Sequence, residues 1–187
     1  MEIEIRRLLP ADAAVYREIR LEGLESHPEA FGSTFEAESV QPLRRFAERL
    51  TDSAVFGAFD GEKLLGIAGF AARTGAKEAH KGLLWEMYVK PEARGAGVGQ
   101  RLIEAIIEFA RERVELLQLS VICDNQSAHR LYTRLGFVEY GIEKNSLKQH
   151  GRYYDEILMA LDLTPDSDRH AVHPQRADAA LCADRVS

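Results

Sequence analysis

The residues with the clearest chemical potential lie at positions 94–99. This run begins with Arg94 and continues through Gly95, Ala96, Gly97, Val98 and Gly99. Glycine lets the backbone turn closely around a ligand and leaves its N–H groups accessible. A helix that starts after such a turn adds unpaired N–H groups and a partial positive charge. Together with the Arg94 guanidinium, this pattern predicts a binding site for a phosphate-bearing ligand.

The spacing of the run argues against two nucleotide-binding motifs. A P-loop needs Gly-Lys-Ser/Thr, whereas Gly99 is followed by Gln100 and Arg101. A dinucleotide fingerprint needs a third glycine where this chain has Gln100, and the surrounding pattern is not an opening βαβ unit. A glycine-rich connector that binds nothing is the remaining alternative.

A second informative run follows the apolar segment 119–123. Residues 124–127 (Asp-Asn-Gln-Ser) are helix-capping types, and Gly136 is a typical helix end. Between them an apolar stripe at helical spacing is formed by Ala128, Leu131, Tyr132 and Leu135. Asn125 and Tyr132 are about two helical turns apart. Both side chains can therefore face one ligand.

Both runs resemble blocks of the GNAT superfamily of acyl-CoA-dependent N-acyltransferases. Arg-x-x-Gly-x-Gly (94–99) is similar to its pyrophosphate loop, and Asn-x-x-Ala-x-x-Leu-Tyr (125–132) to its second block. The resemblance covers about residues 2–163 and implies one α/β (α+β) domain, 1–163. Its central sheet is expected to be mixed, mostly antiparallel and about seven-stranded, with flanking helices. The fourth and fifth strands are expected to splay apart to bind CoA.

Hydrophobic periodicity gives the expected elements. Strands are predicted at 2–7, 54–59, 64–73, 83–89, 116–123, 137–147 and 152–161. Helices are predicted at about 10–26, 43–50, 97–113 and up to 135, with 27–41 irregular. Residues 164–187 lack periodicity and are predicted to be a disordered tail.

The resemblance implies an N-acetyltransferase in which an amine directly attacks the thioester of acetyl-CoA, without a metal. Tyr132 would give a proton to the leaving thiolate, and a buried packing aromatic is the alternative. A covalent route through Cys123 is the minor alternative to direct attack. The residues expected to contact acetyl-CoA are Met87, Tyr88, Val89, Arg94, Gly95, Ala96, Gly97, Val98, Gly99, Asn125, Ala128 and Tyr132.

Glu86 is the candidate for removing the proton of the amine. An amine with a pKa of about 10 is only about one part in a thousand neutral at pH 7, so its proton needs an acceptor. Glu86 is expected to alternate with Trp85 and Met87 on the strand beside the acyl group. Two alternatives stay open, namely packing at a polar face and binding the amine without proton transfer. Some superfamily members place the catalytic Glu nearer the strand start, where this chain has Leu83.

The acceptor amine is expected between the loop of the first two helices and the closing hairpin. The residues predicted to bind it are Phe31, Phe35, Glu36 and Tyr154, with support from Glu38, Tyr153, Asp155 and Glu156. Solvated loop charges and core aromatics are the plainer interpretation. Polyamines, aminoglycosides, amino acids, peptide N-termini and protein lysines all fit. A CoA-binding regulatory or sensor domain without turnover is the alternative function.

Composition narrows the class of protein. The 187 residues carry a formal net charge of −6, which argues against nucleic acid and mildly favours a cationic substrate. No stretch approaches the roughly 20 apolar residues of a membrane span. Two cysteines cannot make a disulfide framework, so a cytoplasmic location is expected. The six histidines show no zinc-ligand spacing, and a homodimer is left open.

Overall fold

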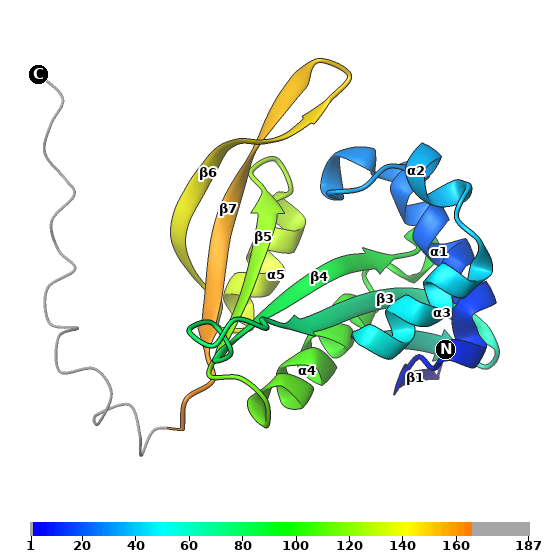
Figure 1. Ribbon diagram of the computed structural model, residues 1–187, viewed down its shortest axis with the longest axis horizontal. Coiled ribbons are helices and arrows are strands. Elements are labelled where there is room, and N and C mark those ends of the chain that lie inside the picture. The colour runs from blue at the N-terminus through cyan, green and yellow to red at the C-terminus, as the bar shows by residue number, and fades with distance from the viewer. Residues whose placement is uncertain (1, 166–187) are drawn as a thin grey trace, which may run out of the picture.

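The computed structural model describes residues 2–165, in which seven strands form one mixed sheet with helices on both faces (Figure 1). The strands are β1 (Ile3–Arg7), β2 (Ala54–Asp60), β3 (Lys63–Ala72), β4 (Lys81–Val89), β5 (Leu116–Ile122), β6 (Val138–Gln149) and β7 (Arg152–Asp162). The helices are α1 (Ala13–Ser26), α2 (Phe35–Ser39), α3 (Leu43–Asp52), α4 (Val98–Arg111) and α5 (Gln126–Arg134). Single 3-10 turns are η1 (Pro10–Asp12), η2 (Pro28–Ala30) and η3 (Pro91–Ala93).

The strand order is β1-β2-β3-β4-β5-β7-β6, and every neighbouring pair is antiparallel except β4 with β5. This confirms the predicted fold class. The expectation that 27–41 is irregular was wrong, since the segment contains η2 and α2. Thr34 supplies the local cause, because its hydroxyl accepts a hydrogen bond from the backbone N–H of Ala37 and caps α2. The predicted tail 164–187 lies almost wholly outside the described residues, and its boundary stays a prediction.

Strands β4 and β5 pair only at one end. Their parallel register covers Lys81 with Leu116, Gly82 with Leu117 and Leu83 with Gln118. Beyond these pairs the strands separate, as Figure 1 shows, while β4 continues along β3 to Val89. The edge of β4 that faces β5 is therefore free of the sheet ladder from residue 84 to 89. The predicted splay is present.

A bulge in β4 interrupts the alternation of side chains. Two residues, Glu86 and Met87, lie opposite the single residue Ala68, and Glu86 has a left-handed φ of 51°. Trp85 packs into the cluster beneath α1 and α3, where the Glu86 carboxylate also lies, while Met87 packs on the α4 side. The predicted alternation of Glu86 with Trp85 was wrong, because the bulge turns two consecutive side chains to the same face.

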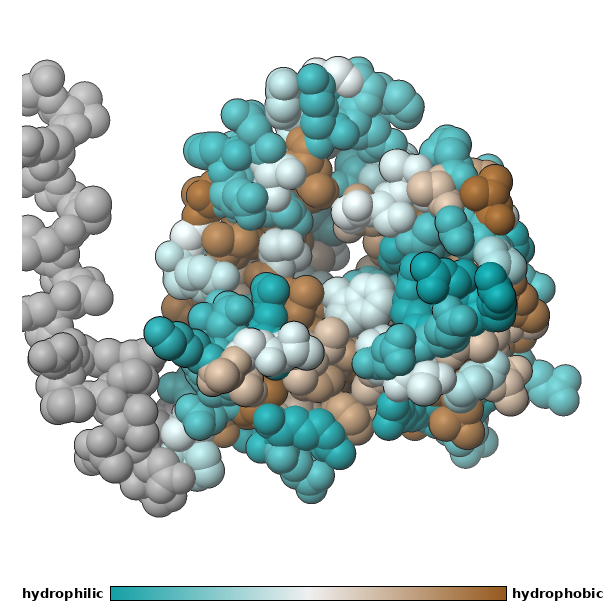
Figure 2. Space-filling model, viewed as in Figure 1, coloured by the Kyte–Doolittle hydropathy of each residue, from teal (hydrophilic) through white to brown (hydrophobic). Residues whose placement is uncertain are grey.

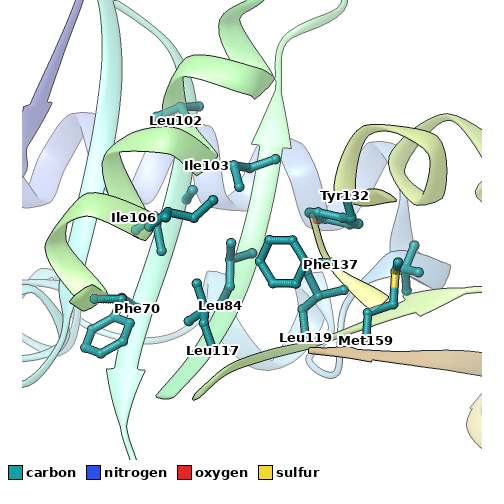
Figure 3. Close-up of a cluster of buried hydrophobic side chains, with 14 of the residues drawn as sticks. Phe70, Leu84, Leu102, Ile103, Ile106, Leu117, Leu119, Tyr132, Phe137 and Met159 are labelled. Carbon is teal, nitrogen blue, oxygen red and sulfur yellow. The ribbon is translucent and has the colours of Figure 1, made fainter. Parts of the chain in front are cut away.

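Two apolar clusters, one on each face, hold the sheet between its helices. On the α4 face, Leu102, Ile103 and Ile106 pack toward Leu84 and Leu117 (Figure 3). On the other face the largest fully buried side chains include Tyr16, Ile19, Leu24, Phe46 and Leu50. None of the helices within residues 2–165 is both long and apolar enough to cross a membrane.

Candidate functional site

Two adjoining cavities lie where β4 and β5 separate. The first, here called the cradle, has a volume of about 580 Å³ and lies between the end of β4, the glycine run and α5. The second, here called the chamber, has a volume of about 370 Å³ and lies between β4, β5, β7 and the start of α5. The surface is hollowed between the β6–β7 hairpin and the α1–α3 side (Figure 2). Seven residues line both cavities, namely His27, Glu29, Ala30, Met87, Asn125, Ala128 and Tyr132.

The glycine run forms the floor of the cradle. Gly95 and Gly97 have φ angles of 77° and 75°, and a Cβ at either position would meet nothing within 4 Å. These two glycines are therefore required by backbone conformation, and the space beside them is open. Helix α4 begins at Val98 directly after this turn. The N–H groups of its first turn have no partner within the helix and can bind an anion.

Arg94 is held at the mouth of the cradle by two contacts. Its Nε donates to the carbonyl oxygen of Val89 at 3.0 Å, and its Nη2 lies 2.9 Å from Nε2 of His27. Because a guanidinium can only donate a hydrogen bond, Nε2 of His27 is the acceptor in this contact, and its Nδ1 lies 3.6 Å from a Glu29 oxygen. Val89 is among the residues predicted to contact acetyl-CoA, and its carbonyl oxygen is engaged by Arg94. His27 was missed, since no spacing in the sequence links it to Arg94.

The structure gathers the predicted cofactor-binding residues around the cradle. Apart from Ala96, all of them line it, namely Met87, Tyr88, Val89, Arg94, Gly95, Gly97, Val98, Gly99, Asn125, Ala128 and Tyr132. An open anion-binding turn, a free strand edge and Arg94 fit a ligand with both phosphate and amide groups. Their contact with acetyl-CoA stays a prediction.

Tyr132 and Asn125 stand where the two cavities meet. Tyr132 is 5 % exposed and packs edge-on against Phe137, with ring centroids 5.8 Å apart. Burial raises the pKa of Tyr132 above its ordinary value, so the hydroxyl stays protonated across the physiological range. The Asn125 side-chain oxygen caps α5 by accepting from the N–H of Ala128 at 3.1 Å. Its amide hydrogens remain available to a ligand.

The chamber is acidic. Four carboxylate residues belong to its wall, and none of its lining residues within the described chain is Lys or Arg. The acidic residues are Glu29, Glu86, Asp124 and Glu156. The cradle differs, since Arg94 and Arg134 both line it and, among its described lining residues, Glu29 alone is acidic.

The carboxylate of Glu86 is enclosed on the α1 side of the sheet. Its side chain is 0 % exposed, and its two oxygens lie 2.7 and 2.8 Å from the Tyr16 hydroxyl. Arg20 and Arg49 approach it at 3.4 and 4.0 Å. Burial raises the pKa of Glu86 to about 7, although Arg20, Tyr16 and Arg49 all favour the ionised form.

Glu38 completes this buried network. It is bonded to Arg20 at 2.7 Å and to Arg49 at 3.1 Å. Burial works to raise the pKa of Glu38, but the two guanidiniums outweigh it and lower the pKa to about 2. Glu38 is therefore engaged by arginines and does not line the chamber. The network was missed, although Arg20 beside Tyr16 on the buried stripe of α1 was a usable signal.

The four residues predicted to bind the acceptor are not brought together around one cavity. Phe31 lines the cradle and lies beneath Arg20, 4.8 Å from guanidinium carbon to ring centroid. Phe35 packs on the core under α1 and α3, and Glu36 is exposed on α2. Tyr154 lies beside Arg152. The α2 cap explains this placement, because it turns Phe35 inward and Glu36 outward.

Residues 16–137 match the model of the Acetyltransferase (GNAT) family. The chain belongs to this family. It is 34% identical over 145 residues to an aminoglycoside N(6')-acetyltransferase type 1 from Stenotrophomonas maltophilia, covering 72% of this chain and 86% of that protein. It is also 33% identical over 95 residues to the N-alpha-acetyltransferase RimI of Mycobacterium tuberculosis, covering 51% of this chain. The chain spans 58% of that relative and 28% of an uncharacterized N-acetyltransferase from Methanocaldococcus jannaschii.

Solved GNAT structures share the fold. An acetyltransferase from Streptococcus pneumoniae superposes with a TM-score of 0.77 at 24% identity, covering 87% of this chain and 100% of that one. A ribosomal-protein-alanine N-acetyltransferase from Brucella melitensis gives 0.71 at 26% identity, covering 85% and 99%. The yncA protein of Salmonella typhimurium, solved with its cofactor acetyl-CoA, gives 0.73 at 23% identity, covering 88% and 96%.

Proposed function

We propose that this protein transfers an acetyl group from acetyl-CoA to an amine of a small molecule or peptide by direct attack. The observation that carries the proposal is the junction of the two cavities at Tyr132. One cavity offers an anion-binding turn and the other offers carboxylates, so each suits one of the two substrates of such a reaction. Membership of the GNAT family supports the same conclusion.

The cradle fits acetyl-CoA by its chemistry. The N–H groups at the start of α4 and the Arg94 guanidinium suit a pyrophosphate, and the open edge of β4 suits the amides of a pantetheine arm. Bound acetyl-CoA would supply a thioester whose carbonyl carbon accepts the amine nitrogen, so that a C–N bond forms and the C–S bond breaks. Asn125, with its oxygen fixed by the α5 cap, can orient a ligand amide through its NH₂ group.

Tyr132 is proposed as the general acid. Its hydroxyl holds a proton at neutral pH because burial raises its pKa, and it lies in the wall shared by both cavities. It can give this proton to the departing sulfur. An ammonium acceptor first releases one proton to solvent water and attacks as the neutral amine. The second proton, which the nitrogen loses when the amide forms, then restores the hydroxyl through water.

In this proposal Glu86 is a positioning residue, whose buried carboxylate holds Tyr16, Arg20 and Arg49 on the α1 side of β4. Both of its carboxylate oxygens contact Tyr16, which places them on the α1 side of the bulge. A transfer of the amine proton to Glu86 would have to pass through that hydroxyl or a water. Its role as the general base stays a prediction, which the pH profile of a Glu86→Gln variant tests.

The relatives support an amine acceptor but differ in the molecule. Their names specify an aminoglycoside amine, an N-alpha amine, and methionine sulfoximine or methionine sulfone. We infer an amine substrate in a cytoplasmic protein that binds neither nucleic acid nor a membrane. A homodimer stays open and is decided by light scattering on the purified chain.

The decisive experiment is an acetyl-CoA turnover screen over a panel of amines, with release of free thiol as the readout. The panel contains polyamines, aminoglycosides, amino acids, peptides with free N-termini and a lysine-containing peptide. Amine-dependent thiol release, with the acetylated amine identified by mass spectrometry, is the expected result. Binding of acetyl-CoA without turnover of any amine would overturn the proposal and favour a CoA-binding regulatory domain.

A further inference from the structure

We propose that Glu156 binds the ammonium group of the acceptor and makes the chamber selective for cationic amines that lack a neighbouring carboxylate. This inference rests on the proposed function, since it names the class of amine that the chamber admits. Its evidence is the position, the partners and the surroundings of the Glu156 side chain in β7.

Glu156 differs from Asp124 and Glu86 in its partners, and from Glu29, which lies near His27, in being held by two hydroxyls. Asp124 is paired with Arg152 at 3.0 Å, and the Glu86 carboxylate lies among Tyr16 and two arginines. Glu156 accepts hydrogen bonds from two serine hydroxyls and has no Lys, Arg or His partner in the described part of the chain. Its negative charge is therefore stabilised by dipoles but not neutralised by a cation.

The two hydroxyls fix the carboxylate from both sides. Ser120 of β5 donates to Oε1 at 2.7 Å, and Ser146 of β6 donates to Oε2 at 2.6 Å. Glu156 thus lies between two neighbouring strands with both oxygens oriented. Ser120 itself lines the chamber, so this arrangement is part of the chamber wall. A carboxylate that is held in advance loses little side-chain freedom when a ligand binds.

A distortion of β6 brings Ser146 to this position. The register of β6 with β7 shifts between Glu143 and Leu147, and Asn145 has a left-handed φ of 54°. Asp155, the residue before Glu156, holds the distorted segment by accepting from the Asn145 N–H at 2.9 Å and from Lys144 at 2.7 Å. Two adjacent residues of β7 therefore have different roles. Asp155 stabilises the distorted segment, and Glu156 accepts a hydrogen bond from the Ser146 hydroxyl that this segment brings within reach.

The chamber geometry determines which amines fit. Tyr132 and Glu156 both line the same cavity of about 370 Å³, so an amine held by Glu156 lies in the space that Tyr132 borders. An ammonium is attracted by the Glu156 carboxylate, which no cation neutralises in the described chain, and a substrate carboxylate is repelled by it. The favoured class is an alkyl or sugar ammonium, and a zwitterionic α-amino acid is disfavoured.

The test compares 1,5-diaminopentane with L-lysine, which carry the same two amines and differ by one carboxylate. Binding of each is measured by calorimetry in the presence of saturating CoA, and acetylation is measured with acetyl-CoA. We expect the diamine to bind at least about tenfold more tightly than lysine. Glu156→Gln should weaken diamine binding about 10- to 100-fold, the range for a hydrogen bond to a charged group. It should raise KM and leave kcat within a few-fold.

Glu143→Gln is the matched control. Glu143 faces Glu156 in the β6–β7 register but is exposed and does not line the chamber. This variant also removes one negative charge, close to Glu156 but outside the chamber, so diamine binding should be unchanged. Circular dichroism checks that both variants are folded.

The binding arm separates this inference from the proposed function. Diamine binding that depends on Glu156, without acetylation of the diamine or of any amine in the panel, would support this inference and contradict the proposed function. Acetylation with equal KM in the wild type and Glu156→Gln would overturn the inference and leave the proposed function intact. Equal binding of lysine and diamine, or no diamine binding by the wild type, also overturns it.

Discussion

The cradle and the chamber share a wall at Tyr132 but are built in opposite ways. The cradle is assembled mainly from two continuous stretches of chain, 87–100 and 125–134, and its charged groups include two arginines. The chamber takes one to four residues at a time from η2, β4, β5, α5 and β7, and its charged groups are mostly carboxylates. The difference shows that two neighbouring cavities can be built differently, one from local stretches of sequence and the other from segments that meet only after folding.

The largest effect is expected from a substitution of Tyr132 in the wall that the two cavities share. Tyr132→Phe keeps the ring that packs on Phe137 and removes only the hydroxyl. We expect turnover to fall by the roughly 10²–10⁴-fold typical of losing a general acid, with acetyl-CoA affinity nearly unchanged. Tyr88→Phe is the control, because Tyr88 lines only the cradle and its hydroxyl bonds Glu22. An unchanged rate in Tyr132→Phe would make Tyr132 a packing residue.

The cradle alone is tested by Gly97→Val. Gly97 has a φ of 75°, so valine strains the turn and carries its side chain into the open space beside it. The acetyl-CoA thermal shift, worth about 2.7 kcal/mol at a hundred times Kd, should disappear. Gly61→Val is a matched control, since Gly61 has a φ of 59° and equally open surroundings but lies in the β2–β3 turn. A full shift in Gly97→Val would exclude the anion-binding turn.

The buried wall of the chamber is tested through the titration of Glu86. Its folded pKa of about 7 lies above the value of 4.5 expected when unfolded, so the folded state binds more protons between these values. The free energy of unfolding should therefore fall as pH rises through this window and level off above about pH 7. Glu86→Gln cannot ionise, and relative to the wild type it should gain about 1 kcal/mol between pH 6 and pH 8.

Chemical denaturation of both proteins at the two pH values measures this difference. An equal difference between the two proteins at both pH values would mean that Arg20 and Arg49 keep Glu86 ionised throughout. The same variant tests catalysis. If Glu86 is the general base, turnover should fall most at neutral pH and recover in part toward pH 9–10, where more amine is already neutral.

The smallest effect should come from Asn125, where a cap and a ligand contact share one side chain. Asn125→Ala removes the bond to the Ala128 N–H and should cost about 1 kcal/mol of folding stability. Asn125→Asp keeps the capping oxygen and loses the amide hydrogens, so stability should change little while acetyl-CoA affinity falls. Thermal melts with and without acetyl-CoA separate the two roles. Equal affinity in Asn125→Asp and wild type would leave Asn125 only its capping role.

The contrast between the cavities also explains what the sequence could predict. The cradle follows from local rules, because a glycine turn, a helix start and a capped helix are each encoded within about ten residues. The bulge at Glu86 depends on how β4 pairs with β3, and no local signal marks a glutamate for a positive φ. The Arg20 and Glu38 pair joins α1 to α2 and is set by packing. Glu156 was named from the sequence, but its two serine partners come from other strands.

The short β4–β5 pairing divides the sheet into two leaves, one holding β1 to β4 and the other β5, β7 and β6. Only three residue pairs of the ladder join them, all at one end. Along β4 beyond Leu83, amides that point toward β3 lie in a ladder, whereas those that point toward the other leaf do not. Amide hydrogen exchange along this strand should therefore divide into slow and fast residues, with the alternation interrupted at the Glu86–Met87 bulge. A ligand bound between the two leaves would slow exchange only at the fast amides of β4. Exchange along this one strand can therefore report whether the site between the leaves is occupied.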